Sequence, residues 1–559
     1  MTGTPATAFE RATALGRLAD EEFDVLVIGG GITGAGVLLE AASRGLRAAL
    51  VEKDDFASGT SSKSSKLVHG GLRYLQQREF ALVHENLVER QRLLKNAPHL
   101  VEPLPFLVPL FGSGGVVDQA VVRAYRMALS MYDVAGGWRI GKRHRKITAQ
   151  ELSSHFPTMR LDRLVAGFLY YDAQADDARL TLAITRTAVL AHGAVAANHA
   201  RVTRLELGAD GRLAGALVEP EGQEPIKVRA KAVVNATGVW ADQVQQLEDE
   251  AARETIRPAK GIHLTVRQEA IPCDMAAVLP VPGDKRSIFV VPWGGHTYVG
   301  TTDTDYRGDL DSPDVSAEDV DYVIAAVNSA VSQPISRADV TGAWAGLRPL
   351  LAAAPGRRRA PSARTADLSR RHRVTLSGTG LVTITGGKLT TYRKMAEDTV
   401  DALTPRLGRL RPSPTNHLRL RGADGLDSFD RLHGEKSSPG PGVISHLRRR
   451  YGGEARAVLS LMGERDDLAE PLVEGLPYLA AEAVYAARYE MATTLEDVLA
   501  RRTRAVLLEA EATSRAAPQV ADLLAGELGW DEARKKEETA AFELFVAAEL
   551  GALRQSRAE

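Results

Sequence analysis

A short apolar strand that runs directly into a glycine-rich turn and a helix constrains the fold of this chain more than any other feature of its sequence. Residues 23–28 (FDVLVI) form a β-branched apolar run of the kind that makes a buried strand. The next six residues (GGGITG) fit the pattern G-x-G-x-x-G, with Gly29, Gly31 and Gly34 at the fixed positions. Such glycines permit a tight turn and let the backbone approach a pyrophosphate at the N-terminus of the following helix.

The rest of this unit fits a βαβ arrangement. Residues 32–43 have a helical pattern and are followed by Gly45, which stands where a helix commonly ends. Residues 47–51 (RAALV) read as a second strand, and Glu52 follows it, 18 positions after Gly34. A carboxylate at that place can accept a hydrogen bond from a ribose 2′-hydroxyl, and it would repel the 2′-phosphate of NADP. The unit therefore predicts a dinucleotide site, which at this point is open to FAD or NAD.

A second segment that contacts the nucleotide is predicted at residues 233–238 (VVNATG). Here a strand that follows a β-rich stretch leads into Ala-Thr-Gly. In flavoprotein folds a segment of this kind returns to the nucleotide and places its backbone nearby. We therefore expect Ala236 and Gly238 among the cofactor-binding residues, which favours FAD.

Length, charge and cysteine content set broad limits on the class of protein. The 559 residues exceed what one hydrophobic core usually serves, so we expect two or three domains. Lys and Arg number 70 against 71 Asp and Glu, a balance that argues against nucleic acid as a partner. The single cysteine, Cys273, excludes an intramolecular disulfide and a cysteine-based metal cluster. Residues 1–20 lack the apolar core of a signal peptide and no run of 18 apolar residues occurs, so we expect a cytoplasmic protein without a spanning helix.

The pattern along the chain changes between helical and β-rich stretches. We expect residues 1–20 to be poorly ordered. Residues 100–111 are apolar but contain three prolines, which excludes a long helix. The other expected elements are helices over residues 80–94 and 120–134, strands over 201–234 with a hairpin loop at 208–211, a β-rich stretch over 287–302, and a strand over 382–385. Residues 405–442 are rich in Pro, Gly and Ser and are interpreted as a linker, and the helical region beyond it contains a capping box of Thr493 and Glu496.

Four longer motifs together point to a known family. They are SSKSSKLVHGGLRYL at residues 61–75, GTTDTDY at 300–306, GLRPL at 346–350 and GGKLTTYRK at 386–394. In the order and spacing of these motifs the chain resembles the FAD-dependent glycerol-3-phosphate dehydrogenase family, within the D-amino-acid oxidase-like superfamily. The resemblance runs from about residue 23 to 397 and continues in TTLEDVLARRTR at residues 493–504.

The resemblance implies an α/β fold in three parts. A doubly wound, Rossmann-like FAD-binding domain carries an inserted β-rich substrate domain, and a helical C-terminal domain follows. The expected boundaries are 20–98, 165–256 and 375–404 for the FAD-binding domain, 99–164 and 257–374 for the substrate domain, 405–442 for the linker and 443–559 for the C-terminal domain.

The resemblance also implies a reaction and the residues that carry it. The expected reaction is oxidation of sn-glycerol 3-phosphate to dihydroxyacetone phosphate by hydride transfer from C2 to N5 of the flavin. Arg73, Arg348 and Lys388 are expected at the substrate, where cations bind a phosphate group. His69 and His263 are the candidate proton acceptors because the pKa of histidine lies near working pH, and the choice between them is open.

Further residues are expected around the cofactor and the substrate. The Ser-rich loop and the GGKLTT motif offer hydroxyls, backbone donors and a charge to the pyrophosphate and ribityl chain through Ser61, Ser62, Ser64, Ser65, Lys66, Gly387, Thr390 and Thr391. Tyr74 is expected either to line the substrate site or to pack beneath it. Asp303, in the GTTD sequence, fits a turn residue as well as a site residue.

Three basic runs bear on the partners of the protein. The runs at residues 142–146, 356–359 and 448–450 fit either solvated faces or peripheral contact with an anionic membrane, and the apolar stretch 104–111 is a candidate for helping the protein dock. The resemblance implies a membrane quinone as the electron acceptor. The alternatives are a glycerol-3-phosphate oxidase that reduces O₂ to H₂O₂, and another flavin hydroxy-acid or amine oxidoreductase. The sequence allows a homodimer, and neither a metal nor nucleic acid is expected.

Overall fold

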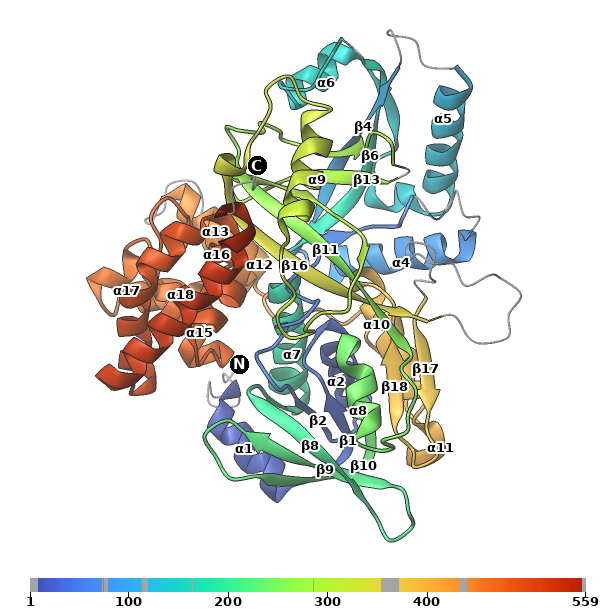
Figure 1. The fold of residues 1–559 in the computed structure, drawn as a ribbon. Helices are drawn as coiled ribbons and strands as arrows, with labels where there is room; N and C mark the ends of the chain where they lie inside the picture. Colours follow the sequence, from blue (N-terminus) through green and yellow to red (C-terminus); the bar gives the residue numbers. More distant parts are fainter. Residues whose placement is uncertain are drawn as a thin grey trace.

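Two β-sheets and a group of C-terminal helices form the three parts of the molecule (Figure 1). The computed structural model describes residues 9–72, 74, 79–112, 119–162, 164–284, 286–352, 371–432 and 440–554. The first sheet lies in the lower half of Figure 1 and the second sheet in the upper half, and the C-terminal helices lie beside the two. This arrangement confirms the predicted fold class.

The first sheet has eight strands in the order β17-β18-β10-β1-β2-β7, with β9 paired to β10 and β8 paired to β9. The strands from β18 to β7 run parallel, and the others join by antiparallel pairs. Parallel strands covered on both faces read as continuous apolar runs, and all residues of β2 are buried. The strands are β1 (Glu22–Ile28), β2 (Ala48–Val51), β7 (Val195–Ala197), β8 (Ala200–Leu207), β9 (Leu213–Pro220), β10 (Ile226–Asn235), β17 (Arg373–Leu376) and β18 (Val382–Thr385).

Helix α2 (Ile32–Ser43) has the bounds that the sequence predicts, and it contacts both α7 (Asp177–His192) and α10 (Tyr392–Asp401). The short helices α8 (Ala241–Gln246) and α11 (Thr404–Leu407) contact β10. Helix α1 (Arg11–Asp20) packs on β7 and β10 and buries Ala14, Leu15 and Leu18. The expectation of poor order is therefore wrong for residues 11–20, because three apolar side chains on one helical face have a sheet to pack against.

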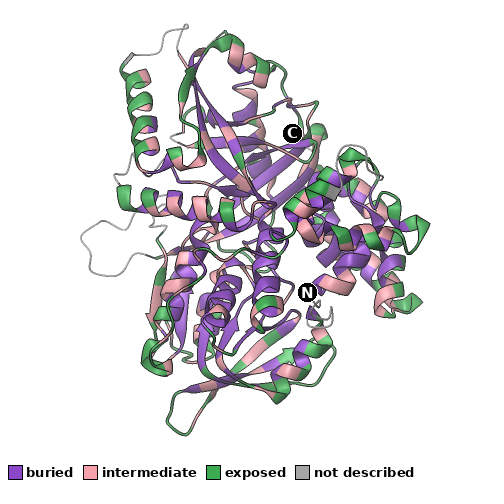
Figure 2. Ribbon diagram, turned by 180° about the vertical axis from the view of Figure 1, so that it is seen from behind, coloured by how far each residue is buried: buried purple, intermediate pink, exposed green. Residues whose placement is uncertain are grey.

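The second sheet has ten strands in the order β15-β11-β14-β13-β12-β4-β6-β3, with β16 paired to β11 and β5 paired to β6. Figure 2 shows that buried residues follow the strands of both sheets. Helix α9 (Ala317–Asn328) contacts β11, β12, β13 and β14. The strands are β3 (Leu67–Val68), β4 (Val101–Phe111), β5 (Arg145–Ile147), β6 (Leu164–Ala175), β11 (Ile256–Arg267), β12 (Ala276–Pro280), β13 (Ser287–Trp293), β14 (His296–Gly300), β15 (Thr304–Asp305) and β16 (Val340–Leu351).

The Pro-broken apolar stretch is the strand β4, which pairs with β6 along its length. Its prolines, Pro103, Pro105 and Pro109, all occupy odd positions, so the missing N–H groups belong to one edge of the strand. Leu107 is fully buried and Phe106 is 1% exposed. The stretch 104–111, a candidate from the sequence for membrane docking, therefore cannot contact a membrane. Strand β6 also lies in the second sheet, whereas the expected boundaries assigned it to the FAD-binding part.

Helices α4 (Phe80–Asn96), α5 (Gln119–Val134) and α6 (Ala149–His155) accompany the second sheet. The C-terminal helices are α12 (Leu426–Leu432), α13 (Pro441–Tyr451), α14 (Ala455–Met462), α15 (Ala480–Glu490), α16 (Ala505–Leu508), α17 (Ala510–Leu528) and α18 (Glu532–Arg554). They share one hydrophobic core with Tyr298 and Trp344 of the second sheet. Among the described residues, no helix is both long enough and apolar enough to cross a membrane.

Two expectations for the C-terminal half are corrected. Much of the predicted linker is packed chain, since Leu420 is 1% exposed and Phe429 is fully buried. The capping box is displaced by one residue, because Thr494 Oγ1 accepts the N–H of Asp497 and Asp497 Oδ2 accepts the N–H of Thr494. Asp497 thus begins the short π-helical turn η9 (Asp497–Arg502).

Candidate functional site

The turn after β1 requires glycine at two places. Gly29 has a φ of +107°, and a Cβ built on it would lie 2.9 Å from the carbonyl oxygen of Ala236. A Cβ on Gly34 would lie 1.8 Å from the carbonyl oxygen of Gly29, so α2 can pack onto the turn only without a side chain there. The N-cap residue Gly31 provides no side-chain cap, and the first turn of α2 has no acidic residue. This helix end is therefore suited to a pyrophosphate.

Glu52 lies at the end of β2, beside the glycine turn. Its carboxylate accepts hydrogen bonds from the N–H of Gly30 (2.5 Å) and the N–H of Asp54 (3.0 Å). Burial raises the pKa of Glu52, and the two backbone donors act in the opposite direction. The position next to the turn fits the predicted ribose contact.

The Ala-Thr-Gly segment meets the same turn from strand β10. Asn235 stands opposite Ile28 in the parallel register, and the N–H of Ala236 donates to the Ile28 carbonyl (2.9 Å). Gly238 has a φ of +63° and begins the short helix η3 (Gly238–Trp240). Residues 236–238 therefore border the turn, as expected for a segment that returns to the nucleotide.

The Ser-rich loop reaches from the glycine turn to the second sheet. Near one end, Ser61 Oγ accepts the N–H of Ile32, the first residue of α2 (2.8 Å). Near the other end, Ser65 Oγ lies 2.8 Å from His263 Nε2, and the Ser65 carbonyl accepts a hydrogen bond from the Tyr298 hydroxyl (2.7 Å). A single loop thus connects the predicted pyrophosphate site with a predicted proton acceptor.

Three other predicted cofactor-binding residues of this loop have partners inside the protein. Ser64 donates through its N–H (3.1 Å) and Oγ (2.6 Å) to Asp177. Lys66 Nζ lies 3.1 Å from Asp177 Oδ1 and donates to the Ser62 carbonyl (3.0 Å). Lys66 is 1% exposed, and burial together with the charge of Arg504 lowers its pKa to about 8. This geometry does not support contact of the ammonium with a pyrophosphate, because Asp177 holds it in the interior.

His263 lies on β11 and is 2% exposed. Its ring stacks on Trp344 of the neighbouring strand β16, with centroids 4.8 Å apart and planes 11° apart. Burial, and then the charges of Lys66 and Arg348, hold the pKa of His263 well below its usual range. The imidazole is therefore neutral at physiological pH.

His69 belongs to a second group of predicted residues, where β3 meets the short helix η6 (Leu389–Thr391). The N–H of His69 donates to Thr390 Oγ1 (3.2 Å). Lys388 Nζ lies 3.9 Å from the centre of the Tyr74 ring, a cation–π distance. His69, Tyr74, Lys388 and Thr390 are thus brought together although more than 300 positions separate the two segments.

The glycines before Lys388 shape this group. Gly387 has a φ of +83°, and a Cβ on it would lie 2.3 Å from the sulfur of Met395. The following turn is closed by Thr391, whose Oγ1 donates to the Lys388 carbonyl (3.4 Å). The close packing at Gly387 fixes the chain direction from which Lys388 extends.

Arg348 lies on β16 opposite Ala259 of β11. Its guanidinium is 3.3 Å from Asp303 Oδ1, and it donates to Thr301 Oγ1 and to the Thr302 carbonyl, each at 3.2 Å. Its side chain is 24% exposed, so the cation is oriented from the GTTD segment and remains accessible. Asp303 therefore acts at least as the partner of Arg348. The predicted phosphate ligand Arg73 lies outside the described residues.

Sequence reasoning missed three residues that the structure places beside this site. Asp177 at the start of α7, Trp344 on β16 and Arg504 after η9 surround Lys66. Trp344 follows the alternation of a strand that also carries Arg348, which is a usable signal. Asp177, which follows Asp176, and Arg504, at the end of the sequence RRTR, offered none, because charged residues usually lie on the surface.

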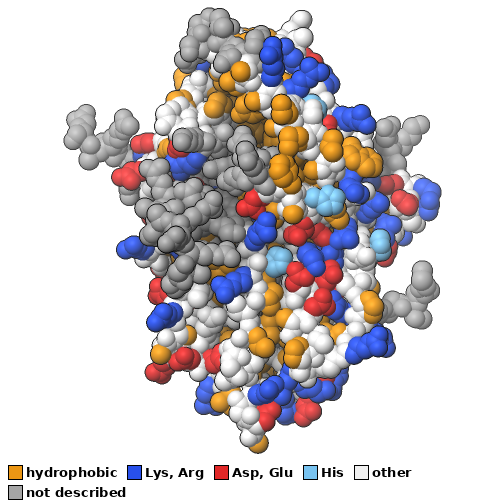
Figure 3. Space-filling view, turned by 90° about the vertical axis from the view of Figure 1, so that its right-hand side faces the viewer, with side chains coloured by type: hydrophobic (Ala, Val, Ile, Leu, Met, Phe, Trp, Pro, Cys, Tyr) orange, Lys and Arg blue, Asp and Glu red, His pale blue; other side chains and the backbone are white. Residues whose placement is uncertain are grey.

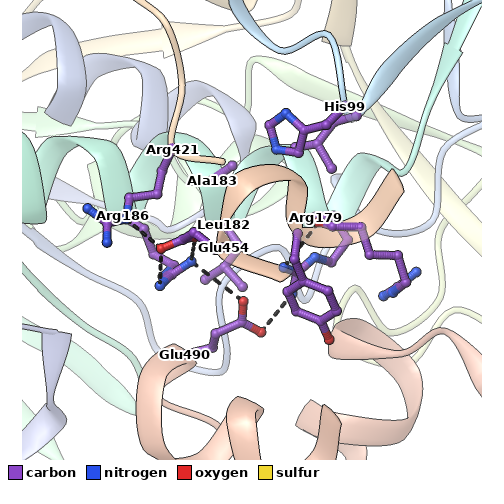
Figure 4. Close-up of a pocket in the computed structure, with 11 residues that line it drawn as sticks. His99, Arg179, Leu182, Ala183, Arg186, Arg421, Glu454 and Glu490 are labelled. Atoms are coloured by element: carbon purple, nitrogen blue, oxygen red, sulfur yellow. Dashed lines mark hydrogen bonds and ion pairs between the residues drawn. The ribbon is translucent and has the colours of Figure 1, made fainter. Parts of the chain in front are cut away.

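A small cleft lies elsewhere, between α7 and the C-terminal helices (Figure 4). Arg186 lies between Glu454 and Glu490, and Arg179 meets Glu490 from the other side. The cleft is lined by His99, Leu100, Arg179, Leu182, Ala183, Arg186, Arg421, Arg450, Tyr451, Glu454 and Glu490. None of the predicted site residues is among them, and the paired charges make it a junction between parts of the chain.

Comparison with known proteins adds to this geometry. A family described as FAD dependent oxidoreductase matches residues 24–393, and one described as the C-terminal domain of alpha-glycerophosphate oxidase matches residues 413–535. Glycerol-3-phosphate dehydrogenase 2 of Mycobacterium tuberculosis (strain ATCC 25618 / H37Rv) is 41% identical over 557 residues, covering 98% of this chain and 92% of that protein. The mitochondrial glycerol-3-phosphate dehydrogenase of Homo sapiens is 37% identical over 557 residues, covering 95% of this chain and 74% of that protein.

Two solved structures are also similar. The glycerol-3-phosphate dehydrogenase from Bacillus halodurans complexed with FAD has a TM-score of 0.79 and 32% identity, covering 98% of this chain and 99% of that chain. L-alpha-glycerophosphate oxidase from Mycoplasma pneumoniae with FAD bound has a TM-score of 0.55 and 19% identity, covering 71% of this chain and 98% of that chain. At that identity the second likeness concerns the fold alone.

Proposed function

The chain belongs to the family of FAD-dependent oxidoreductases, and from this premise we propose that it oxidises sn-glycerol 3-phosphate to dihydroxyacetone phosphate. The observation that carries the proposal is the loop that joins the N-terminus of α2, through Ser61, to His263, through Ser65. This loop connects a cofactor site with a proton acceptor. The charge of Arg348, an oriented cation, contributes to the lowered pKa of the same histidine. Relatives that span nearly the whole chain carry the name glycerol-3-phosphate dehydrogenase.

FAD is held at the glycine turn and the end of α2. The N–H groups of that helix end that Ser61 does not cap would bind the pyrophosphate, and Glu52 would accept a hydrogen bond from the ribose. Gly387 and Thr391 border the group of residues around Lys388. When bound, FAD supplies the two-electron acceptor for the hydrogen that leaves C2 of the substrate.

Cations of this chain bind the substrate phosphate. Arg348 is accessible and is held in place by Asp303, and Lys388 presents its ammonium beside Tyr74. Arg73 joins them according to the family motif in which it stands. Each charge-assisted contact of this kind contributes about 1.5–3 kcal/mol, and the guanidinium adds direction because its donors form a fixed fork.

A histidine takes the proton of the substrate hydroxyl. His263 is neutral and hydrogen-bonded to Ser65, so it can accept that proton, while His69 lies in the second group beside Thr390. We assign the role of base to His263, because the loop that caps α2 through Ser61 also bonds His263 Nε2 through Ser65. His69 then has a substrate-contacting role.

The electrons pass to a quinone in a membrane on which the protein lies. Helix α5 supports the proposed membrane contact, because Met127 (63% exposed), Met131 (37%) and Val134 (83%) form one apolar stripe at helical spacing. Trp138 of the following 3₁₀ helix η2 (Gly137–Ile140) is 54% exposed. Figure 3 shows the face that contains α5, with hydrophobic side chains gathered in its upper half among Lys and Arg.

Basic residues accompany this apolar stripe. Arg123 and Arg126 on α5, and Lys142 and Arg143 after η2, are exposed. Each contributes about 1 kcal/mol near an anionic lipid surface. Of the other two basic runs, 356–359 lies outside the described residues. In the run 448–450, the side chain of Arg450 is 10% exposed and pairs with Asp176, so Arg450 is no membrane ligand.

The experiment that tests the proposal is anaerobic addition of glycerol 3-phosphate to the purified holoenzyme, with absorbance followed at about 450 nm, where oxidised flavin absorbs. Bleaching with formation of dihydroxyacetone phosphate is expected. Slow recovery in air that a quinone accelerates supports the dehydrogenase, whereas fast recovery with H₂O₂ supports the oxidase. A yellow protein that does not bleach would refute glycerol 3-phosphate as the substrate.

A further inference from the structure

Three arginines of the C-terminal domain reach into the loop between β2 and β3, which is called loop 53–66 after its residues. Arg501, Arg502 and Arg504 belong to or follow η9, and they are 7%, 2% and 1% exposed. Charged side chains are almost never this deeply buried unless they are paired. Their partners therefore indicate what the C-terminal domain does.

Two of these arginines hold the start of the loop through one carboxylate. Arg502 donates through Nη1 (2.5 Å) and Nη2 (2.8 Å) to the two oxygens of Asp55. Arg501 Nε donates to the same group at 2.6 Å. Asn198 Nδ2 also donates to Asp55 (3.0 Å), so this buried carboxylate is fully bound.

The third arginine holds the end of the loop. Arg504 Nη2 donates to the Ser62 carbonyl (2.5 Å) and to Asp177 Oδ1 (2.9 Å). Lys66 binds the same two acceptors, so the ammonium and the guanidinium share the Ser62 carbonyl and Asp177. The second carboxylate needed to balance these two buried cations is Asp176, 3.5 Å from Arg504 Nε.

The loop between these anchors contains the residues that face the site. Ser61 caps the first N–H of α2, Ser65 binds His263, and Thr60 Oγ1 donates to the Leu347 carbonyl next to Arg348 (2.6 Å). Lys66 in turn lies 4.9 Å from the ring of Trp344, on which His263 stacks. A shift of the anchors is therefore passed to the pyrophosphate end and to the histidine.

We propose that Arg501, Arg502 and Arg504 are positioning residues for the oxidation, through which the C-terminal domain fixes loop 53–66 between the flavin site and His263. The proposal rests on the proposed function for the identity of the reaction. A buried network whose charges are all paired favours one arrangement of the chain, and loss of one partner leaves an unpaired buried charge. The C-terminal domain is thus part of the catalytic unit.

The test compares Arg504→Lys with Arg186→Gln in the full-length holoenzyme. Lysine keeps the charge but cannot reach the Ser62 carbonyl and Asp177 with one planar group. Arg186 is also buried at the same junction, yet its partners are Glu454, Glu490 and Tyr485, and none of these belongs to the loop. It therefore controls for loss of stability alone.

For Arg504→Lys we expect kcat to fall about tenfold or more, because a displacement of about 1 Å can cost a factor of about 100. The KM for glycerol 3-phosphate should change less than kcat, and the visible spectrum of the bound flavin should shift. Trypsin should cut the folded protein after Lys63 or Lys66, and it should leave the loop intact in Arg186→Gln. Unchanged kcat, spectrum and cleavage pattern in Arg504→Lys would overturn the proposal.

Two provisions keep the result interpretable. If Arg504→Lys does not fold, Asp55→Asn replaces it, since this isosteric change removes the charge that Arg501 and Arg502 bind. An enzyme that does not oxidise glycerol 3-phosphate refutes the proposed function, and the flavin spectrum and tryptic cleavage then decide the positioning role on their own. If both Arg504→Lys and Arg186→Gln showed loop cleavage and a spectral change, Arg504 would contribute only to general stability, and the positioning role would be refuted.

Discussion

The imidazole of His263 lies flat on the indole of Trp344, with ring centroids 4.8 Å apart. The two residues face each other across β11 and β16, and Ser65 binds His263 Nε2 from the Ser-rich loop. The stack removes the imidazole from water on one side, and the nearby cations Lys66 and Arg348 oppose its protonation. These causes act together on the pKa of His263 and keep it low.

The first prediction concerns pH. A base must be unprotonated to act, so kcat should stay on its plateau from about pH 6.5 upward, the ordinary pKa of histidine, and its acid limb should lie well below that value. His263→Asn should lower kcat by about 10²–10⁴-fold with FAD retained. An acid limb near the ordinary value that disappears in His69→Asn, and not in His263→Asn, would place the base on His69. The measurement is kcat against pH for the three proteins.

The second prediction concerns the phosphate. Arg348→Ala should raise the KM for glycerol 3-phosphate by about 10- to 150-fold, the equivalent of one charge-assisted contact of about 1.5–3 kcal/mol. Bound FAD should be unchanged, because Arg348 donates to Asp303, Thr301 and Thr302 and not to the glycine turn. Arg204→Ala, which removes an exposed partner of Glu206, is the matched control. Equal KM values for the two variants would remove Arg348 from the phosphate site.

The third prediction concerns the cofactor. A Cβ on Gly31 would meet only the side chain of Ser61, with Oγ at 3.1 Å, so Gly31→Val should fold but place its branched side chain at the N-terminus of α2. FAD content should fall strongly while the far-UV circular dichroism is retained. Gly526→Val, where nothing lies within 4 Å of the Cβ, should keep its FAD. Full flavin content in Gly31→Val would contradict the pyrophosphate assignment.

The sequence predicted those parts of the fold that depend on local chemistry. The bounds of α2 follow from an apolar strand, the glycine turn and Gly45, all within a short segment. Strand β4 was not recognised, because its prolines argue against regular structure and only pairing with β6 reveals the strand. The packed stretch around Leu420 was read as a linker for the same reason, since its partners lie far away in the sequence.

The candidate site was predictable only residue by residue, within its motifs. His263 and Ser65 were both named from their motifs, but their contact spans 198 positions and no local pattern predicts it. Lys66 was assigned to the cofactor because its serine neighbours were, whereas the fold brings it to Asp177, 111 positions away. The role of Arg504 was hidden in the same way, because its motif reads as a charged helix surface.

The fourth prediction concerns the membrane. Met127→Glu with Met131→Glu should reduce binding to vesicles that contain anionic lipid by about tenfold or more, since each buried methionine contributes about 1.5–3 kcal/mol. Oxidation of glycerol 3-phosphate with a soluble dye should be unaffected. The control is Leu544→Glu, which alters a side chain on α18 that is 72% exposed. This variant should bind vesicles as the parent protein does. Vesicle sedimentation measures the difference, and equal binding of all three proteins would exclude the α5 face.

The fifth prediction concerns stability, through the ion pair that joins the first sheet to η9. His199 Nε2 lies 3.1 Å from Asp497 Oδ2, and the side chain of His199 is 12% exposed. Burial lowers the pKa of His199, but the charge and hydrogen bond of Asp497, with the charge of Asp55, outweigh burial and the opposing Arg501. The net effect raises the pKa above its ordinary value, so the folded state binds the proton more tightly than the unfolded state.

A raised histidine pKa has a defined sign in the pH dependence of stability. The contribution is fully present below about pH 6.5, the unfolded value, and it is lost as the pH rises through the folded pKa. His199→Asn should therefore lower Tm more at pH 6 than at pH 8.5, while His417→Asn, at an exposed position, should show no such difference. Thermal unfolding of the holoenzyme at both pH values measures this. A deficit in Tm that is independent of pH would mean that His199 stabilises the junction by packing, and not by its charge against Asp497.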